Sequence, residues 1–318
     1  MPVNSDKPNR WKADIVRSVD LYNDWFVRFA PQAYRDTRAQ TTAKVKEAFA
    51  RMANMTNIAS AVLLGSPWVL PILRMVTAPP LARDRLIGLA GVPGNLVRNM
   101  ELRQRISPQM TDGEVKANLE RIADLVTRLI DRDLLPWPGS ANRPSDEDVH
   151  RAATIVADRL CGAEADPIIR NAQEARQLAA IQGWLEARGY TKADPGVSFQ
   201  TMKPGTFAFR LIVPVRIERN GKRVNIPIDA VVNPHAARTG DLPLLIEAKS
   251  AGDYTNTNKR RKEEATKVTQ LRNTYGHAVR FVLFLCGYFD TGYLGYEAAE
   301  GIDWVWEHRI DDLAEFGV

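Results

Sequence analysis

The sequence predicts an α/β (α+β) protein, with an all-helical amino-terminal region and a carboxy-terminal mixed β-sheet flanked by helices. Apolar residues in 1–140 recur at helical spacing, and no alternating strand pattern interrupts them. From residue 207 onward, alternating or continuous apolar runs indicate strands, with helical patterns before and between them. We therefore expect a helical domain over residues 1–140 and a second domain over residues 141–318, whose core elements follow the order αβββαβ.

The composition is that of an ordinary globular protein with a basic balance. The 318 residues are 45% hydrophobic and 25% charged, and the formal net charge is +5, which suits a polyanionic partner. Cys161 and Cys286 lie in apolar surroundings and no signal peptide is visible, so we expect a cytoplasmic protein. The apolar stretch 59–76 contains Gly65 and two prolines, which favours short buried helices over a membrane span.

Several signals divide the helical region. Thr111 and Glu114 have the spacing of a capping box and predict the start of a helix. The segment 135–144 is rich in proline and is the best candidate for a linker to the second domain. Arginines are dense in the stretch that contains Arg83 and Arg85, and their planar side chains suit phosphate binding. A solvated helical surface with a few salt bridges is an equal alternative.

The second domain is expected to begin with helices and to continue with strands. A helix over about 169–188 carries Glu174 at the end of a buried apolar stripe. In the strand 207–218, the alternate apolar residues are expected on one face. In the strand 224–232, the apolar residues are again expected on one face, with Asp229 on the other.

The run 242–250 is typical of a short buried strand, but Glu247 and Lys249 interrupt it. Residues i and i+2 of a strand share a face, so these two charges project side by side. If this strand forms a hairpin with the preceding one, centred near Arg238, Asp229 lies opposite Glu247. Two carboxylates at that distance repel each other unless a hard divalent cation lies between them. A surface ion pair between Glu247 and Lys249 is the alternative.

The pattern Pro227-Ile228-Asp229 … Glu247-Ala248-Lys249 resembles the motif of the PD-(D/E)XK nucleases. A basic helix over about 259–275 and an apolar strand over 279–286 complete the helix, three-strand, helix, strand order that is known for that superfamily. The sequence from Glu247 through Trp306 is similar to the XamI-type family of type II restriction endonucleases.

This resemblance implies Mg²⁺-dependent hydrolysis of double-stranded DNA at a short, palindromic site, by a homodimer whose twofold axis matches that of the DNA. Asp229 and Glu247 would bind the metal, with the Ala248 carbonyl as a third ligand, and Mn²⁺ could substitute for Mg²⁺. Lys249 would contact the phosphate and the attacking water. Glu174 is a further metal ligand, a group that supports the metal site without binding the metal, or a plain solvated acid. No nucleotide cofactor is expected, because the sequence lacks a phosphate-binding glycine loop.

The residues that contact DNA are less well defined by the sequence. The cluster Lys259, Arg260, Arg261 and Lys262 would bind backbone phosphates or form a solvated face. The acidic and aromatic residues of 287–306 indicate packing or a dimer surface, and the alternative is readout of cytosine amino groups. Two rival functions remain: a repair or junction-resolving nuclease of the same fold, and a non-catalytic DNA-binding protein.

Overall fold

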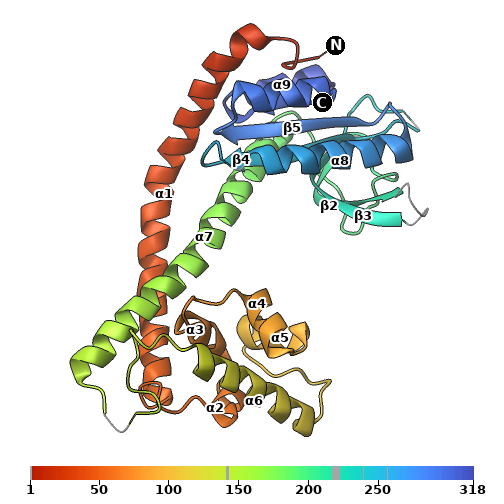
Figure 1. Cartoon of the computed structure of the whole chain (residues 1–318). Coiled ribbons are helices and arrows are strands. Elements are labelled where there is room, and N and C mark those ends of the chain that lie inside the picture. Colours follow the sequence, from red (N-terminus) through yellow and green to blue (C-terminus); the bar gives the residue numbers. More distant parts are fainter. Residues whose placement is uncertain (1, 141–142, 217–222, 239, 256) are drawn as a thin grey trace. The chain divides into compact units, whose positions relative to one another are not determined.

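A computed structural model describes residues 2–140, 143–216, 223–238, 240–255 and 257–318. The chain folds into two compact units. The sheet unit consists of Met1–Phe29 and Ile169–Val318, and the helical unit consists of Ala30–Ile168. Two long helices, α1 (Pro8–Arg51) and α7 (Asp146–Glu186), contribute to both units (Figure 1). The sheet unit is therefore discontinuous in sequence and the helical unit lies within it, whereas we expected a single division at residue 140.

The sheet unit contains one mixed sheet with the strand order β1-β2-β3-β4-β5-β6. Its strands are β1 (Thr191–Lys192), β2 (Thr206–Arg216), β3 (Arg223–Asn233), β4 (Leu244–Ala251), β5 (Arg280–Gly287) and β6 (Asp303–Trp306). Strands β2, β3 and β4 form an antiparallel meander, and β5 and β6 continue the sheet in parallel with β4. With α7 before the meander and α8 (Thr257–Tyr275) after it, the expected α+β class and the order αβββαβ are confirmed (Figure 1).

Helices cover both faces of this sheet. On one face, Leu178, Ile181 and Leu185 of α7 pack on strand residues that include Ala230 and Ile246. The other face is covered by α8, by α9 (Thr291–Ala299) and by the start of α1, through the buried residues Ile15, Val268, Leu271, Tyr293 and Leu294. The 3₁₀ segment η2 (Glu307–Phe316) adds Leu313 to the α7 side. The charged end of β4 therefore lies in a sheet that is buried on both sides.

The expectation that β2 and β3 each keep one apolar face is wrong. Phe207 and Phe209 pack on the α7 side of the sheet, but Leu211 and Val213 pack on the α8 side. The change occurs at Arg210, whose backbone is left-handed with φ 52°. Strand β3 changes face at the same level, since Ala230 and Val232 belong to the α7 side and Ile228 to the α8 side. Phe209 pairs with Ala230 before this step, and Leu211 pairs with Ile228 after it. The apolar residues of both strands therefore change face at the same level, beside Asp229. Ile217 lies outside the described residues.

The helical unit is built on its own apolar core. Besides parts of α1 and α7, it contains α2 (Ser60–Gly65), η1 (Pro67–Val69), α3 (Leu70–Met75), α4 (Arg83–Ala90), α5 (Gly94–Arg103) and α6 (Asp112–Leu129). The capping box between Thr111 and Glu114 at the start of α6 is confirmed. The apolar stretch 59–76 forms short helices whose residues are largely buried, as expected. No helix in the described part of the chain is long and apolar enough to cross a membrane.

The segment that we expected to be a linker is partly packed into this core. Leu135 and Trp137 are buried there, and the indole of Trp137 donates a hydrogen bond to the Asn54 carbonyl at 2.7 Å. Residues 141 and 142 lie outside the described residues. The reason for the difference is that the chain on both sides of residue 140 belongs to the helical unit.

The left-handed backbone at Arg210 gives a test of the step in β2. An L-residue in this conformation costs roughly 1 kcal/mol relative to glycine. We therefore expect Arg210→Gly to be more stable than Arg210→Ala by about 1 kcal/mol in urea unfolding. Ile212 is half exposed on the same strand without a positive φ, so there glycine should be less stable than alanine. An Arg210→Ala protein as stable as Arg210→Gly would contradict the described backbone.

Candidate active site

The pairing of β3 with β4 brings Asp229 and Glu247 together. The antiparallel register pairs Ala230 with Ile246, so its continuation by one residue sets Asp229 opposite Glu247. This agrees with the hairpin centred near Arg238 that the sequence predicts. Asp229 Oδ2 also accepts a hydrogen bond from the Ala248 backbone N–H at 2.9 Å. The two acids and the Ala248 peptide therefore form one local group, next to the last residue pair of the β3–β4 ladder.

Glu247 is a buried carboxylate, 5% exposed, and two ammonium groups compensate its charge. Its Oε1 atom lies 3.1 Å from Lys249 Nζ and 2.7 Å from Lys267 Nζ. Lys249 comes from the same strand, as expected, whereas Lys267 comes from α8. The second oxygen, Oε2, is buried and accepts no hydrogen bond from the described residues. An unpartnered buried carboxylate oxygen is costly, so Glu247 retains capacity for a further positive ligand.

Asp229 and Lys249 each have a raised pKa. Burial, followed by the nearby charge of Glu247, raises the pKa of Asp229 to about 6, although the Ala248 N–H and the two lysines act in the opposite direction. For Lys249, burial acts to lower the pKa, but the carboxylates of Glu247 and Glu264 outweigh it and the pKa is raised. Lys249 is therefore an ammonium group in this arrangement. In this form it can donate hydrogen bonds to an anion.

A second layer of buried polar groups lies behind Lys249. Glu264 of α8 is 1% exposed, and its Oε1 lies 3.5 Å from Lys249 Nζ. Its other oxygen, Oε2, accepts a hydrogen bond from the Tyr293 hydroxyl at 2.6 Å. Glu297 of α9 is fully buried. Burial, together with the charge of Glu264, raises the pKa of Glu297 to about 9. Glu297 is therefore a neutral acid at pH 7.

Sequence reasoning did not place Glu264, Lys267 or Glu297 beside the two acids. It considered Lys267, together with the basic cluster, as a contact to backbone phosphates, and Glu297 as one of the acids of 287–306. The signal that could have found two of them is the spacing on α8, where Glu264, Lys267, Val268 and Leu271 follow an i, i+3, i+4, i+7 pattern. Val268 and Leu271 are buried core residues. Charges within such a stripe must face the sheet, and here they face the charged end of β4.

The arrangement of Asp229, Glu247 and the Ala248 peptide fits a hard divalent cation. Such ions prefer oxygen ligands, and Mg²⁺ needs only one or two carboxylates because it keeps several waters. The buried, unpartnered Oε2 atom of Glu247 is the observation that favours a cation here. In the described part of the chain, no three side chains of Asp, Glu, His or Cys converge on one metal position. An ion held by these residues would complete its coordination with the carbonyl, water and substrate oxygens.

Comparisons with known proteins identify the family of this chain. Residues 53–306 match the model of the XamI restriction endonuclease family. The chain belongs to the XamI restriction endonuclease family. The type II restriction enzyme SalI of Streptomyces albus G is 54% identical over 317 residues, which are 99% of each chain. The crystal structure of protein VC1899 from Vibrio cholerae is 13% identical in sequence, and its alignment covers 78% of this chain and 52% of VC1899. The TM-score of 0.29 is too low to indicate a shared fold.

Family membership confirms the resemblance seen in the sequence and the enzyme class that it implied. The chain is a restriction endonuclease, and enzymes of this class bind DNA and use a divalent metal ion. The particular residues of its active site stay predictions from geometry. The other predicted site residues of this restriction endonuclease lie on α7, α8 and α4.

Glu174 forms an ion pair with an arginine of β2. Its Oε1 forms an ion pair with Arg210 at 2.8 Å, and the two side chains are 38% and 65% exposed. Arg210 belongs to the step in β2 beside Asp229. A direct role of Glu174 as a metal ligand would require that it leave this pair, so a supporting role through Arg210 agrees better with the geometry.

The basic cluster at the start of α8 is divided in its environment. Arg261 stacks on the Tyr296 ring, with its guanidinium carbon 4.0 Å from the ring centroid. Lys262 is exposed. The side chains of Lys259 and Arg260 lie outside the described residues. Of the cluster residues whose side chains the structure describes, Lys262 is the exposed one.

The two arginines predicted in the helical unit also differ. Arg83 forms an ion pair with the buried Glu101 at 2.6 Å, and Glu101 also pairs with Arg74 at 2.7 Å. Arg83 therefore contributes to a buried charge network, while Arg85 is exposed on the same helix, α4. Arg85 is the freer of the two to contact a phosphate.

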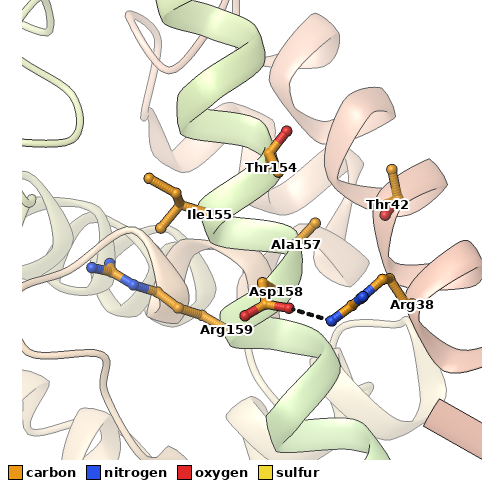
Figure 2. Close-up of a pocket in the computed structure, with 7 residues that line it drawn as sticks. All are labelled: Arg38, Thr42, Thr154, Ile155, Ala157, Asp158 and Arg159. Carbon is orange, nitrogen blue, oxygen red and sulfur yellow. Dashed lines mark hydrogen bonds and ion pairs between the residues drawn. The ribbon is translucent and has the colours of Figure 1, made fainter. Parts of the chain in front are cut away.

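The helical unit of this restriction endonuclease has a hollow of about 440 Å³ (Figure 2). It is lined by Arg38, Thr42, Thr154, Ile155, Ala157, Asp158 and Arg159. An ion pair of 3.0 Å joins Arg38 to Asp158, and both side chains are more than half exposed. Asp158 is the only acid among these described lining residues. The hollow therefore lacks the paired carboxylates that the sheet unit provides.

The raised pKa of Glu297 gives a test of the buried layer. Glu264 and Arg261 of α8 and Tyr293 of α9 face this acid. Between its ordinary pKa of 4.5 and about 9, folded Glu297 holds a proton that the unfolded chain has lost. The free energy of unfolding should therefore decrease as pH rises through this window, and Glu297→Gln should weaken that dependence.

Urea unfolding at pH 6 and at pH 8.5 measures this difference. Glu263→Gln, at an exposed position of α8, is the matched control and should keep the dependence of the parent protein. Equal pH dependence in Glu297→Gln and the parent protein would show that Glu297 is not held neutral in the folded state.

Proposed function

We propose that this chain is a type II restriction endonuclease that hydrolyses double-stranded DNA at a short, palindromic sequence, with Mg²⁺ as cofactor and Mn²⁺ as a substitute. The observation that carries the proposal is the meeting of Asp229 and Glu247 on β3 and β4, with Lys249 beside them. The similarity to the type II restriction enzyme SalI supports the type II assignment. The proposed cation is held by Asp229, Glu247 and the Ala248 carbonyl.

Each of these residues has a distinct part in phosphodiester hydrolysis. A bound Mg²⁺ neutralises charge on the phosphate and lowers the pKa of water. Asp229 and Glu247 provide the negative charge that holds the cation, and burial in the sheet fixes their position. Lys249, whose raised pKa keeps it protonated, donates hydrogen bonds to the phosphate oxygens where negative charge develops. Glu264 holds the Lys249 ammonium from behind at 3.5 Å.

The proposed DNA contacts come from both units. Lys259, Arg260, Arg261 and Lys262 of α8 and Arg83 and Arg85 of α4 are proposed to bind backbone phosphates, which position the protein without reading sequence. Lys262 and Arg85 are exposed, whereas Arg83 and Arg261 already have partners within the protein. We therefore expect Lys262 and Arg85 to contribute most to the salt dependence of binding.

Cleavage assays on plasmid DNA with Mg²⁺ test the catalytic assignment. Asp229→Asn, Glu247→Gln and Lys249→Met should each lower the cleavage rate by about a hundredfold or more, because each removes a charge at the reacting phosphate. Glu263→Gln changes an exposed acid on α8 and should cut at the rate of the parent protein. Sequencing of the ends should give uniform termini. Random ends, preference for branched DNA, or full activity in the Asp229 variant would reject the proposal.

A homodimer is proposed because one active site cuts one strand of a palindrome. Sedimentation of the protein with its DNA should give a species that contains twice the 35.6 kDa chain mass. The rate of double-strand cleavage should then fall with dilution below the dissociation constant of the dimer. A single chain per DNA with concerted cutting of both strands would contradict this arrangement.

A further inference from the structure

Lys267 lies beside Glu247, the carboxylate that the proposed cation would also contact. Its Nζ atom lies 2.7 Å from Glu247 Oε1, closer than the 3.1 Å of Lys249 to the same oxygen. The Lys267 ammonium also donates a hydrogen bond to the Pro227 carbonyl at 3.3 Å. Its side chain is 17% exposed. A lysine from α8 is therefore inserted between the two strands that carry the catalytic motif.

The two ammonium groups on Glu247 differ in what else holds them. Lys249 has a second carboxylate, Glu264, at 3.5 Å. Lys267 has a single ion-pair partner among the described residues, which is Glu247, and its other contact is a neutral carbonyl. A cation bound to Glu247 would repel both ammonium groups strongly, because the charges would be separated by such short distances. Lys249 then keeps a partner, and Lys267 loses the one that it has.

We propose that Lys267 is the counter-ion that takes the place of the cation beside Glu247 in the metal-free enzyme, and that a divalent cation displaces its ammonium group toward the DNA phosphate. The inference rests on the proposed function and deepens it, since it assigns a residue of α8 to the metal and substrate site. The flexible four-carbon stem of lysine allows such a move.

This exchange would couple the binding of metal and DNA. Without DNA, the displaced ammonium has no anion to receive it, so the cation must compete with Lys267 for Glu247. With DNA, the scissile phosphate accepts the ammonium, and the cation binds more tightly. By reciprocity the cation raises the affinity for DNA by the same factor. In the absence of both, Lys267 provides the positive charge next to the buried Glu247.

The test measures cation affinity as well as cleavage, on the full chain. Mn²⁺ binding without DNA is measured by electron paramagnetic resonance for the parent protein, Lys267→Met and Lys267→Gln, with Lys203→Met as the control at an exposed lysine of the same unit. Both Lys267 variants should bind Mn²⁺ about tenfold more tightly, because a positive charge next to the site is removed. Their cleavage of DNA at saturating Mg²⁺ should nevertheless be slower by about tenfold. The control should match the parent protein in both measurements.

Several outcomes would overturn the inference. Unchanged or weaker Mn²⁺ binding in folded Lys267 variants would show that the lysine does not compete with the cation. Tighter Mn²⁺ binding with full cleavage would show that the displaced ammonium does not serve the phosphate. Lys267→Gln keeps a donor for the Pro227 carbonyl, so it provides a folded variant if Lys267→Met unfolds. The proposed function fails separately if neither the parent protein nor the Lys267 variants bind Mn²⁺, or if Glu247→Gln binds Mn²⁺ as tightly as the parent protein.

Discussion

The structure of the sheet unit depends on the compensation of one buried negative charge, that of Glu247. This carboxylate is 5% exposed and lies opposite a second acid, Asp229, so it is stable only with positive charge nearby. Lys249 from the same strand and Lys267 from α8 supply that charge. One oxygen of Glu247 stays buried without a hydrogen-bond donor. A pair of acids with an open ligand position on a buried carboxylate is suited to a divalent cation.

The fold places these groups through two features of the β2–β3–β4 meander. The antiparallel register of β3 and β4 fixes Asp229 opposite Glu247, and the hydrogen bond from the Ala248 N–H holds Asp229 in that position. At the left-handed residue Arg210, the apolar residues of β2 change from one face of the sheet to the other, and those of β3 change face at the same level. The apolar residues on either side of the step can then pack on α7 or on α8, while Asp229 stays half-buried at the step itself.

The sequence was sufficient for the parts of the site that depend on local pattern. Strand alternation and the symmetry of the hairpin about Arg238 predicted that Asp229 and Glu247 would meet, and the motif with its flanking elements predicted the family. The sequence was not sufficient for Lys267 and Glu264, because their contacts depend on how α8 packs on the sheet. It also missed the change of face in β2, since the backbone of Arg210 is set by strand pairing and not by a local preference of arginine.

The central claim is that Asp229 and Glu247 share one divalent cation, and anomalous X-ray diffraction from crystals grown with Mn²⁺ tests it most directly. The account predicts an anomalous peak at about 2.1 Å from a carboxylate oxygen of each acid, close to the Ala248 carbonyl. It also predicts that the Lys267 ammonium will have left Glu247 in those crystals. Saturating Mn²⁺ with no peak between the two acids, in a protein that cleaves DNA under the same conditions, would contradict the account.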